Sequence, residues 1–425
     1  MAITLAFSGG LDTSFCIPHL RETYGEPVRA VTVNTGGAAP DEALRERAFG
    51  LGAEEHIQVD AREALFEDHL SYLIKGNVLR GDVYPLCVGP ERVVQARKVA
   101  EAAREAGARA VAHGSTGAGN DQVRFDVALR LLTGDDLEVL APIRSNELSR
   151  EETTRFLEER GHDVPADTTA YSINRGLWGT TVGGRETHTP TDPLPDDAYP
   201  DSRSPEESFE QSLTFTVRFE EGRPVALDGE PMAPVALIER LNKVGGAYGI
   251  GRDIHVGDTI LGIKGRVGFE APAARILITA HRELEKIVLT KWQRYQKDQL
   301  GDFYGMLLHE ADYFDPVMRD VEAFLDSSQE TVTGTATVKI YKGNVHVQGC
   351  ESRYSMFDAG GATYGEEHAR WDGRDAEGFT RLAGLQAELA QQARSEQAAA
   401  KTSSTPPGPP TRKGESATRP GVVKR

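Results

Sequence analysis

The stretch Ala6–Ser14, with the sequence AFSGGLDTS, constrains the fold of this chain more than any other. An apolar run, Ile3–Phe7, leads into it and an amphipathic run, Phe15–Leu20, follows, which is the order strand, glycine-rich turn, helix. Two adjacent glycines allow the backbone of such a turn to approach a ligand closely. Backbone N–H groups at a helix N-terminus favour an anion. The stretch therefore predicts a phosphate-binding turn.

Asp12 is the unusual residue of this turn. A carboxylate beside a phosphate is repulsive unless a cation lies between them, so Asp12 predicts Mg²⁺. The simpler interpretation is a capped helix, since Ser8, Asp12 and Thr13 are all residue types that cap helices. Capping needs only one of them and does not explain the two glycines. No lysine follows the turn, which excludes the G-x-x-x-x-G-K-[ST] loop.

The length and charge of the chain narrow its class. Its 425 residues are enough for two domains. The formal net charge is −17, from 48 basic and 65 acidic residues, and such a surface repels nucleic acid and anionic lipid at long range. The three cysteines are scattered and no apolar segment approaches membrane-spanning length. We expect a cytoplasmic protein that binds neither nucleic acid nor membranes.

Apolar segments typical of strands alternate with amphipathic segments typical of helices over the first 160 or so residues. The expected strands are 3–7, 28–33, 56–59, 109–112 and 139–141, and the expected helices are 41–51, 63–74, 91–106 and one that begins at a capping box at Ser149. This order predicts an α/β fold with a doubly wound parallel sheet, which binds ligands at the carboxyl ends of its strands.

The pattern changes after Gly161. Residues 185–210 are typical of a surface excursion, alternation at 212–227, 255–267 and 332–347 predicts strands, and 273–296 and 305–326 predict helices. A last helix, 375–395, carries Phe379, Leu382, Leu385 and Leu389 at helical spacing. We expect a nucleotide-binding domain (1–162), an α+β domain (163–372), a C-terminal helix that packs on a neighbouring subunit or domain (373–397) and a disordered tail (398–425).

A second glycine-rich stretch, His113–Phe125, follows the expected strand 109–112 at the same edge of the sheet. Its hydroxyl, amide, carboxylate and guanidinium groups are what an amino-acid substrate needs for recognition. A capped helix after a flexible loop is the alternative, which the neighbouring first turn makes less attractive. A third polar, glycine-rich stretch, Tyr171–Gly184, is typical of a loop over a site, although a structural turn would look much the same.

The first turn resembles the pyrophosphate-binding loop of the ATP pyrophosphatase superfamily, whose members adenylate a substrate. In this order, AFSGGLDTS, HGSTGxGNDQVRF and YSINxxLWG are together similar to the argininosuccinate synthase family. The likeness runs to about Phe269 and returns at Asp375–Phe379. It implies a two-step ligation in which the ureido oxygen of citrulline attacks the α-phosphorus of ATP and the amine of aspartate then displaces AMP.

The resemblance also implies ligands for individual residues and a homotetramer that uses the C-terminal helix. ATP would lie against Ala6, Phe7, Ser8, Gly9, Gly10, Leu11, Asp12, Thr13, Ser14, Val33 and Gly114, with Mg²⁺ on the phosphates and Asp12 as its candidate protein ligand. Aspartate would bind Thr116, Asn120 and Asp121. Citrulline would bind Tyr84, Gly89, Asn120, Arg124, Ser172, Thr181, Gly257 and Phe269. Ser8, Asp12 and Arg124 would carry the chemistry without a covalent nucleophile.

The citrulline side departs from the family pattern. A Gly-Thr-Ser type stretch is replaced here by Pro85–Gly89, and a Glu and a Tyr are replaced by Gly257 and Phe269. The lost Glu is the natural counter-ion of the citrulline ammonium, and a buried ammonium without one is costly. Three explanations stay open: Asp258 replaces the Glu, water fills the gap, or the α-nitrogen of the substrate carries an acyl group such as acetyl or succinyl.

Two other classes of function remain to be weighed. An adenylating enzyme that modifies tRNA would need a basic surface and usually paired cysteines, and this chain has neither. A nucleotide-binding regulator without catalysis would not need the second stretch, which is complete from Thr116 to Arg124. The resemblance to the argininosuccinate synthase family, which implies an AMP-forming ligase of arginine biosynthesis, is therefore preferred to both.

Overall fold

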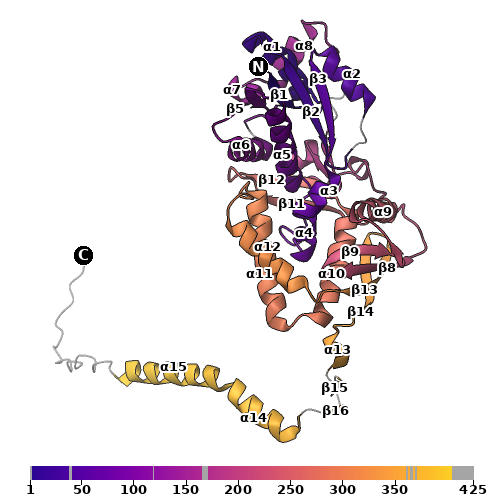
Figure 1. The fold of residues 1–425 in the computed structure, drawn as a ribbon. Coiled ribbons are helices and arrows are strands. Elements are labelled where there is room, and N and C mark those ends of the chain that lie inside the picture. The colour runs from indigo at the N-terminus through magenta and orange to yellow at the C-terminus, as the bar shows by residue number, and fades with distance from the viewer. Residues whose placement is uncertain are drawn as a thin grey trace, which may run out of the picture. The chain divides into compact units, whose positions relative to one another are not determined.

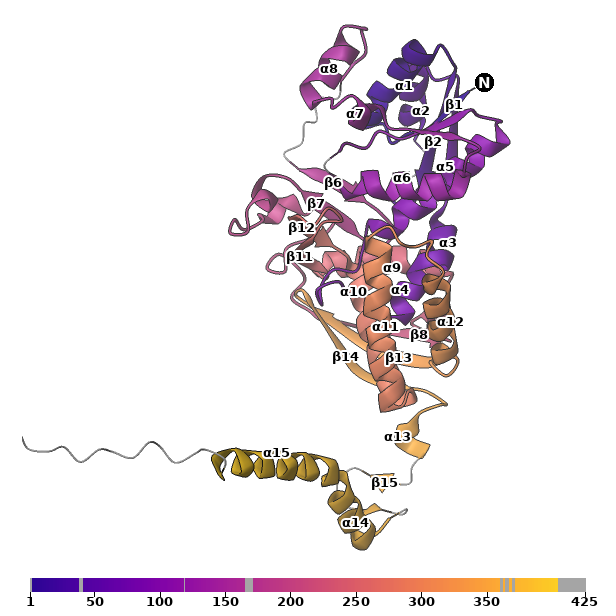
Figure 2. The same cartoon turned by 90° about the vertical axis from the view of Figure 1, so that its left-hand side faces the viewer.

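The computed structural model describes residues 2–37, 41–117, 119–164, 171–359, 362–363, 367–368 and 371–403. The chain forms two compact units, Met1–Phe357 and Asp358–Arg425. Figures 1 and 2 show that the first unit has two lobes, one around a parallel sheet and one around antiparallel sheets. The predicted boundary between domains at residues 162 and 163 falls within this first unit and stays a prediction.

The parallel sheet confirms the predicted fold class. Its strands lie in the order β3-β2-β1-β4-β5, all parallel. They are β1 (Ile3–Ala6), β2 (Val28–Asn34), β3 (Glu55–Asp60), β4 (Ala110–Ala112) and β5 (Glu138–Leu140). The chain order reverses between β1 and β4, and in such sheets the ligand binds at this switch point. Both predicted glycine-rich stretches start there.

Helices cover both faces of this sheet, because neighbouring strand residues enter different cores. Ala30 and Ala110 pack with α1, whereas Val31 and Val111 pack with α5 and α6. The helices are α1 (Leu11–Tyr24), α2 (Glu42–Gly50), α5 (Gly89–Glu105), α6 (Asn120–Thr133), α7 (Pro142–Ser145) and α8 (Arg150–Glu158). The predicted capping box is present, since Ser149 and Glu152 bond each other's backbone N–H groups.

One helix of this lobe is irregular. The expected helix 63–74 is α3 (Arg62–Leu65), a π-helical segment (Phe66–Leu70) and α4 (Ser71–Lys75) in succession. The π segment adds one residue to the turn and shifts the faces on either side, a change that a 3.6-residue period does not reveal.

The second lobe is α+β, as predicted. A four-stranded sheet has the order β11-β12-β7-β6 and a five-stranded sheet the order β10-β9-β8-β13-β14. The strands are β6 (Ser172–Arg175), β7 (Thr180–Gly183), β8 (Leu213–Glu220), β9 (Arg223–Leu227), β10 (Glu230–Pro231), β11 (Arg252–Asp258), β12 (Lys264–Glu270), β13 (Gly334–Tyr341) and β14 (Asn344–Glu351). Each of the three alternating stretches is therefore a hairpin rather than one strand.

The helix bounds of this lobe differ from those predicted. Its helices are α9 (Pro234–Ala247), α10 (Pro272–Val288), α11 (Lys291–His309) and α12 (Val317–Gln329). The expected helix 273–296 is wrong in its end, because Thr290 and Gln293 form a capping box that starts a new helix. The excursion 185–210 holds two short 3-10 helices, Arg185–His188 and Asp196–Ala198.

In the second unit, the single helix expected at 375–395 is two helices, α14 (Gly373–Ala383) and α15 (Leu385–Ser403). The short helix α13 (Met356–Ala359) spans the boundary between the units, and β15 (Ala362–Thr363) and β16 (Glu367–His368) follow it. Part of the expected tail is helical, since α15 continues to Ser403, and residues 404–425 lie outside the described residues.

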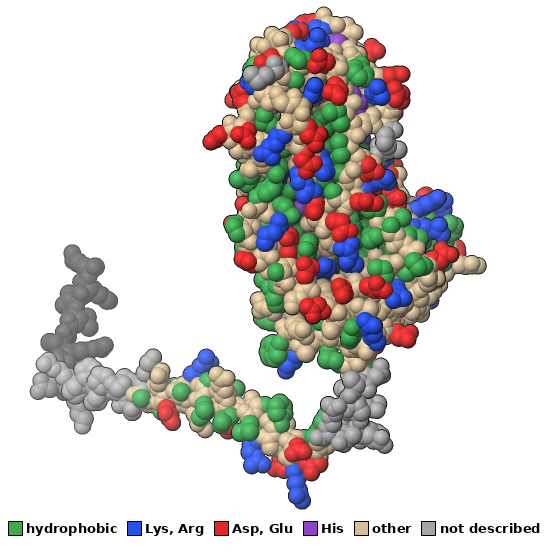
Figure 3. Space-filling model, viewed as in Figure 1, with side chains coloured by type: hydrophobic (Ala, Val, Ile, Leu, Met, Phe, Trp, Pro, Cys, Tyr) green, Lys and Arg blue, Asp and Glu red, His purple; other side chains and the backbone are tan. Residues whose placement is uncertain are grey.

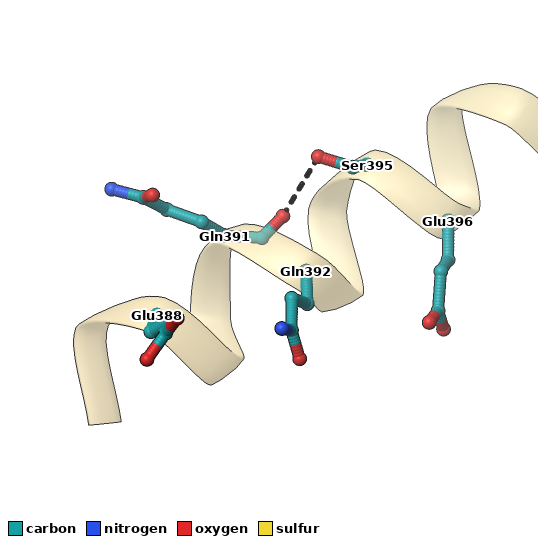
Figure 4. A pocket seen from close by; sticks show the side chains of 5 residues that line it. All are labelled: Glu388, Gln391, Gln392, Ser395 and Glu396. Atoms are coloured by element: carbon teal, nitrogen blue, oxygen red, sulfur yellow. Dashed lines mark hydrogen bonds between the residues drawn. The ribbon is translucent and has the colours of Figure 1, made fainter. Parts of the chain in front are cut away.

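A row of apolar side chains runs along α14 and α15, visible in Figure 3. Phe379 and Leu382 are each 71% exposed within this chain. Figure 4 shows the five side chains that line one pocket; all are polar, all come from α15, and none is a predicted site residue. Of the helices in the described part of the chain, none has the length and apolarity that crossing a membrane requires.

Candidate functional site

The two glycine-rich stretches are in contact at the switch point of the parallel sheet. The first follows β1 and the second follows β4, its neighbour in the sheet. A Cβ atom on Gly114 would lie 3.0 Å from Thr13 Cγ2 and 3.2 Å from the carbonyl carbon of Asp12. Only a glycine allows this approach without a shift of the backbone. The structure thus brings Gly114 together with the predicted phosphate-binding turn.

Within the first turn, the hydroxyl groups shape the loop. Thr13 Oγ1 donates to the carbonyl of Gly10 at 3.3 Å, and Ser14 Oγ donates to that of Gly9 at 3.3 Å. Gly10 is the N-cap of α1, and no side chain caps it among the described residues. The capped-helix interpretation is therefore wrong in its geometry. The first amide groups of α1 receive no side-chain cap, as a phosphate-binding turn requires.

Gly9 adopts the left-handed conformation, with φ of +77°. A Cβ atom there would also lie 2.3 Å from Leu44 Cδ1 of α2. The positive φ favours glycine at this position, and any other residue would also have to displace the Leu44 side chain.

Arg47, on α2, supports this turn, and the sequence did not indicate that role. Its Nε donates to Ser14 Oγ at 3.0 Å, so α2 braces the turn through a side chain far along the chain. Its Nη2 is buried with no hydrogen-bond partner within the described ranges.

Asp12 is half-buried at the start of α1. Burial raises the pKa of its carboxyl group, and Arg150 opposes this rise. The described residues contain no group of three or more His, Cys, Asp or Glu that would hold a metal by itself. Mg²⁺ commonly binds through one or two carboxylates plus substrate phosphates. Asp12 beside a phosphate-binding turn fits that donor set.

The edge predicted for adenine is formed by the ends of β1 and β2. Thr32 Oγ1 donates to the carbonyl of Phe7 at 2.8 Å and lies 2.9 Å from His56 Nε2. Phe7 is buried, and its ring meets that of His56 edge to face. Val33 is partly buried at the end of β2. These contacts hold the backbone near Val33 next to the first turn.

The second stretch supplies an ionic cluster at the start of α6. Asp121 accepts from Arg92 Nε at 2.9 Å and from Arg124 Nη1 at 3.2 Å. Those two guanidinium groups lower the pKa of Asp121 against the effect of burial. Asn120 Oδ1 accepts from the backbone N–H of Ile260 at 2.9 Å, which ties α6 to the β11–β12 turn. Thr116 is exposed on the loop.

Arg124 is nearly fully buried and tightly held. Its Nε and Nη2 donate to the carbonyl oxygen of His309 at 3.2 and 3.1 Å, and Nη2 also lies 3.2 Å from His309 Nδ1. With Asp121 on Nη1, most of its N–H groups have protein partners. Its orientation is therefore set before any substrate binds.

The register of the four-stranded sheet places the predicted citrulline residues on one face. Thr181 lies opposite both Asn174 and Phe269, and Gly257 lies opposite Gly265. Side chains alternate between faces with a period of two. Residues on this common face therefore include the following: Ser172, Thr181, Gly257 and Phe269.

Tyr84 and Gly89 connect this face to α6. The buried Tyr84 ring lies 5.2 Å from that of Phe269 and is stacked on His255 at 5.4 Å, between centroids. A Cβ atom on Gly89 would lie 4.0 Å from Arg124 Nε. Asn174, on the same face as Thr181, accepts from Arg92 Nη2 at 3.1 Å. The segment around Tyr84, the start of α5, α6 and the four-stranded sheet thus meet at one place, although they are far apart in the sequence.

Asp258 does not replace the missing glutamate. It follows Gly257 by one residue, so its side chain lies on the opposite face of the sheet. There it forms an ion pair with Lys264 at 2.6 Å, with both side chains more than half exposed. The first of the three explanations for Gly257 is therefore wrong.

Glu91 is a second residue that the sequence did not indicate. It is 2% exposed in the first turns of α5, and its Oε1 has no hydrogen-bond partner in the described part of the chain. A Cβ atom on Gly176 would lie 1.6 Å from that oxygen, so the carboxyl group occupies the side-chain space of residue 176. Burial raises the pKa of Glu91 to about 8, although Arg92 opposes this.

We expect Glu91→Gln to stabilise the protein above neutral pH. The unfolded chain releases this proton near pH 4.5 and the folded chain only near pH 8, so the wild-type loses stability as pH rises between the two. The neutral amide avoids that loss, worth about 4 kcal/mol at pH 8. Urea unfolding from pH 5 to 9 measures it. Glu101→Gln, an exposed change on α5, is the control, and an equal pH profile for all three proteins would contradict this assignment.

Two family models match this chain. One, described as the arginosuccinate synthase N-terminal HUP domain, matches residues 2–163, and one described as the arginosuccinate synthase C-terminal domain matches residues 171–390. A curated argininosuccinate synthase from Methanocaldococcus jannaschii is 38% identical over 388 residues, which are 91% of this chain and 96% of that protein. Another, from Xanthomonas campestris pv. campestris, is 41% identical over 399 residues, covering 91% and 97%.

Proposed function

Because this chain belongs to the argininosuccinate synthase family, we propose that the contact between its two glycine-rich stretches is the active site. The enzyme is an AMP-forming ligase of arginine biosynthesis that joins citrulline and L-aspartate, using ATP with Mg²⁺. One observation carries the assignment of the site: Gly114 lies against Asp12 and Thr13 at the point between β1 and β4 where the strand order reverses.

The first turn is proposed to hold the triphosphate. The first backbone N–H groups of α1, which no side chain caps, would face it, and Gly9 allows the close approach. Bound Mg²⁺ would supply positive charge at the phosphates, with Asp12 as its protein ligand. Ala6, Phe7 and Val33 form the edge against which the adenine would lie, where Thr32 fixes the backbone of Phe7.

The second stretch is proposed to hold the two amino acids. Asp121 and Asn120, with Thr116, would bind aspartate, because a carboxylate suits its ammonium group. Arg124 would bind citrulline beside Tyr84 and Thr181. His309 and Asp121 already hold the guanidinium group in one orientation. Binding of the substrate therefore loses little side-chain conformational entropy at Arg124.

The chemistry then proceeds in two displacements. The ureido oxygen of citrulline forms a bond to the α-phosphorus while the bond from this phosphorus to the pyrophosphate oxygen breaks. The deprotonated amine of aspartate next bonds to the ureido carbon, and the bond from this carbon to the oxygen breaks, so the oxygen leaves in AMP. The chain contributes position and electrostatic stabilisation rather than a covalent bond.

The order of product release tests this function. With ATP and citrulline but no aspartate, we expect one equivalent of pyrophosphate per site and no free AMP. Added aspartate then releases AMP. Pyrophosphate release that needs a tRNA would instead favour a tRNA-modifying enzyme, and ATP binding without any turnover would favour a nucleotide-binding regulator.

An N-acylated citrulline is a second candidate substrate. It is supported by the face of the four-stranded sheet, where Gly257 offers no carboxylate and Asp258 points away. An acylated nitrogen has no charge to pair and so avoids the cost of a buried ammonium. A higher kcat/KM for citrulline than for N-acetylcitrulline would leave free citrulline as the substrate.

We further propose a cytoplasmic homotetramer that α14 and α15 help to assemble. These helices expose Phe379, Leu382, Leu385 and Leu389, and burying such side chains against another subunit would be favourable.

We expect Leu382→Glu to lower the molar mass measured by light scattering from that of a tetramer to that of a smaller species, because a charge would replace a buried contact. Thr380→Glu, elsewhere on α14, should leave the tetramer intact. A wild-type monomer would refute the assembly, and a tetrameric Leu382→Glu variant would exclude this apolar row from it.

A further inference from the structure

We propose that Arg47 is a positioning residue for the phosphate-binding turn and that it acts through the hydroxyl group of Ser14. The two side chains together fix the peptide between Gly9 and Gly10, so that its N–H group faces the two phosphates that leave as pyrophosphate. This role rests on the proposed function, because it assumes that the triphosphate lies over the N-terminus of α1.

The hydroxyl group of Ser14 lies on the protein side of the turn. Ser14 is fully buried, and its Oγ accepts from Arg47 Nε at 3.0 Å and donates to the carbonyl oxygen of Gly9 at 3.3 Å. A hydroxyl group has one proton to donate, and this one is already used. The Ser14 side chain therefore supports the turn and leaves contact with the phosphates to the backbone.

The hydrogen bond from Ser14 sets the direction in which the peptide between Gly9 and Gly10 faces. The Gly9 carbonyl oxygen points towards the buried Ser14 Oγ. In a planar trans peptide the C=O and N–H groups point in opposite directions, so the N–H group of Gly10 points away from Ser14. Gly10 is the N-cap of α1. Its N–H group is thus held ready for an anion at the N-terminus of this helix.

The packing of α2 holds Arg47 beside the turn. A Cβ atom on Gly9 would lie 2.3 Å from Leu44 Cδ1 and 4.0 Å from Arg47 Cδ, so both side chains border the turn. Residues 44 and 47 are three positions apart and share a face of α2. Ala48, the next residue, is buried in the core that lies between α1 and the parallel sheet. The position of Arg47 is therefore set before a ligand binds.

The guanidinium group of Arg47 also brings a positive charge close to the turn. Burial lowers its pKa and Asp163 opposes this effect, but an arginine side chain stays protonated near pH 7. Its Nη2 is buried and has no hydrogen-bond partner among the described residues. A hydrogen bond donated by a charged group is stronger than one between neutral groups, so the contact with Ser14 Oγ holds the hydroxyl group firmly.

The test uses pyrophosphate and AMP as separate inhibitors of the full-length enzyme. Arg47→Met keeps an apolar stem and removes the charge and the donors. We expect it to raise KM for ATP and the inhibition constant of pyrophosphate by at least ~10-fold each, because a charge-assisted hydrogen bond behind the turn is lost. The inhibition constant of AMP and KM for aspartate should stay within about twofold, since neither ligand places a β- or γ-phosphate in the turn.

A double-mutant cycle tests whether Arg47 acts through Ser14. Ser14→Ala should raise the inhibition constant of pyrophosphate by a factor similar to that of Arg47→Met, and the double variant should bind pyrophosphate little worse than either. Arg47→Lys keeps a charge and a donor and should restore most of the affinity. Arg45→Met is the matched control, since Arg45 is an exposed arginine of the same helix that pairs with Glu42, and it should change none of these constants.

The outcomes separate this role from the function on which it rests. Equal weakening of pyrophosphate and AMP, or losses that multiply in the double variant, would overturn the action of Arg47 through Ser14. If Arg47→Met does not fold, Ser14→Ala decides, because unchanged inhibition by pyrophosphate in that variant would overturn the proposal as well. Absence of AMP and pyrophosphate formation by the wild-type enzyme with ATP, citrulline and aspartate would instead refute the proposed function.

Discussion

An Asp12→Asn variant is expected to lose at least ~100-fold in kcat for aspartate-dependent AMP formation. The carboxylate is the candidate protein ligand for Mg²⁺ at the triphosphate, and losing one preorganised electrostatic group of this kind costs ~10²–10³ in rate. Burial already raises the pKa of Asp12, so the neutral amide does not disfavour folding. The loss should therefore appear in activity and not in the unfolding midpoint. Steady-state kinetics over a range of Mg²⁺ concentrations measures it.

Glu22→Gln supplies the matched control for Asp12. It removes a carboxylate from the same helix, α1, where Glu22 pairs with Arg160 on the surface. We expect this variant to keep wild-type kcat and Mg²⁺ dependence. Full activity of Asp12→Asn would refute the role of this carboxylate.

Arg124→Lys is expected to raise KM for the citrulline substrate by ~10–100-fold and to leave KM for ATP within about twofold. Lysine keeps the charge, but it cannot donate to the carbonyl of His309 and to Asp121 in the same planar arrangement. The substrate-binding group would lose its fixed orientation. Initial rates with each substrate varied in turn separate the two KM values.

Arg130→Lys tests whether any arginine of α6 gives this result. Arg130 is exposed and pairs with Asp126 one helical turn away. Its replacement should change neither KM. If Arg124→Lys raised both KM values equally, the residue would be holding the two lobes together rather than orienting one substrate.

The fold was predictable where residues close together in the sequence determine the secondary structure. Alternation of strands and helices identified the parallel sheet, and the capping box at Ser149 located the start of α8. The end of α10 was missed although Thr290 and Gln293 carry the same signal, because the apolar spacing continues across it. The turns inside the three hairpins were missed because apolar and polar residues alternate with a period of two in both strands, so the pattern looks like one long strand.

The site was predictable only where it is contiguous in the chain. The turn Ser8–Ser14 and the stretch after β4 met as expected, because neighbouring parallel strands end at one edge. Glu91 opposite Gly176, and Arg47 on Ser14, depend on segments that meet only in three dimensions. A glutamate early in a helix normally indicates an exposed position, and nothing local identifies Glu91 as buried.

Transfer of oxygen tests the central claim most directly. The enzyme is given ATP, aspartate and the citrulline substrate labelled with ¹⁸O in its ureido group, and the AMP is analysed by mass spectrometry. If the ureido oxygen attacks the α-phosphorus at this site, each AMP formed carries one ¹⁸O. AMP without the label would contradict the adenylated intermediate, and with it the proposed reaction at the contact between Gly114 and the Ser8–Ser14 turn.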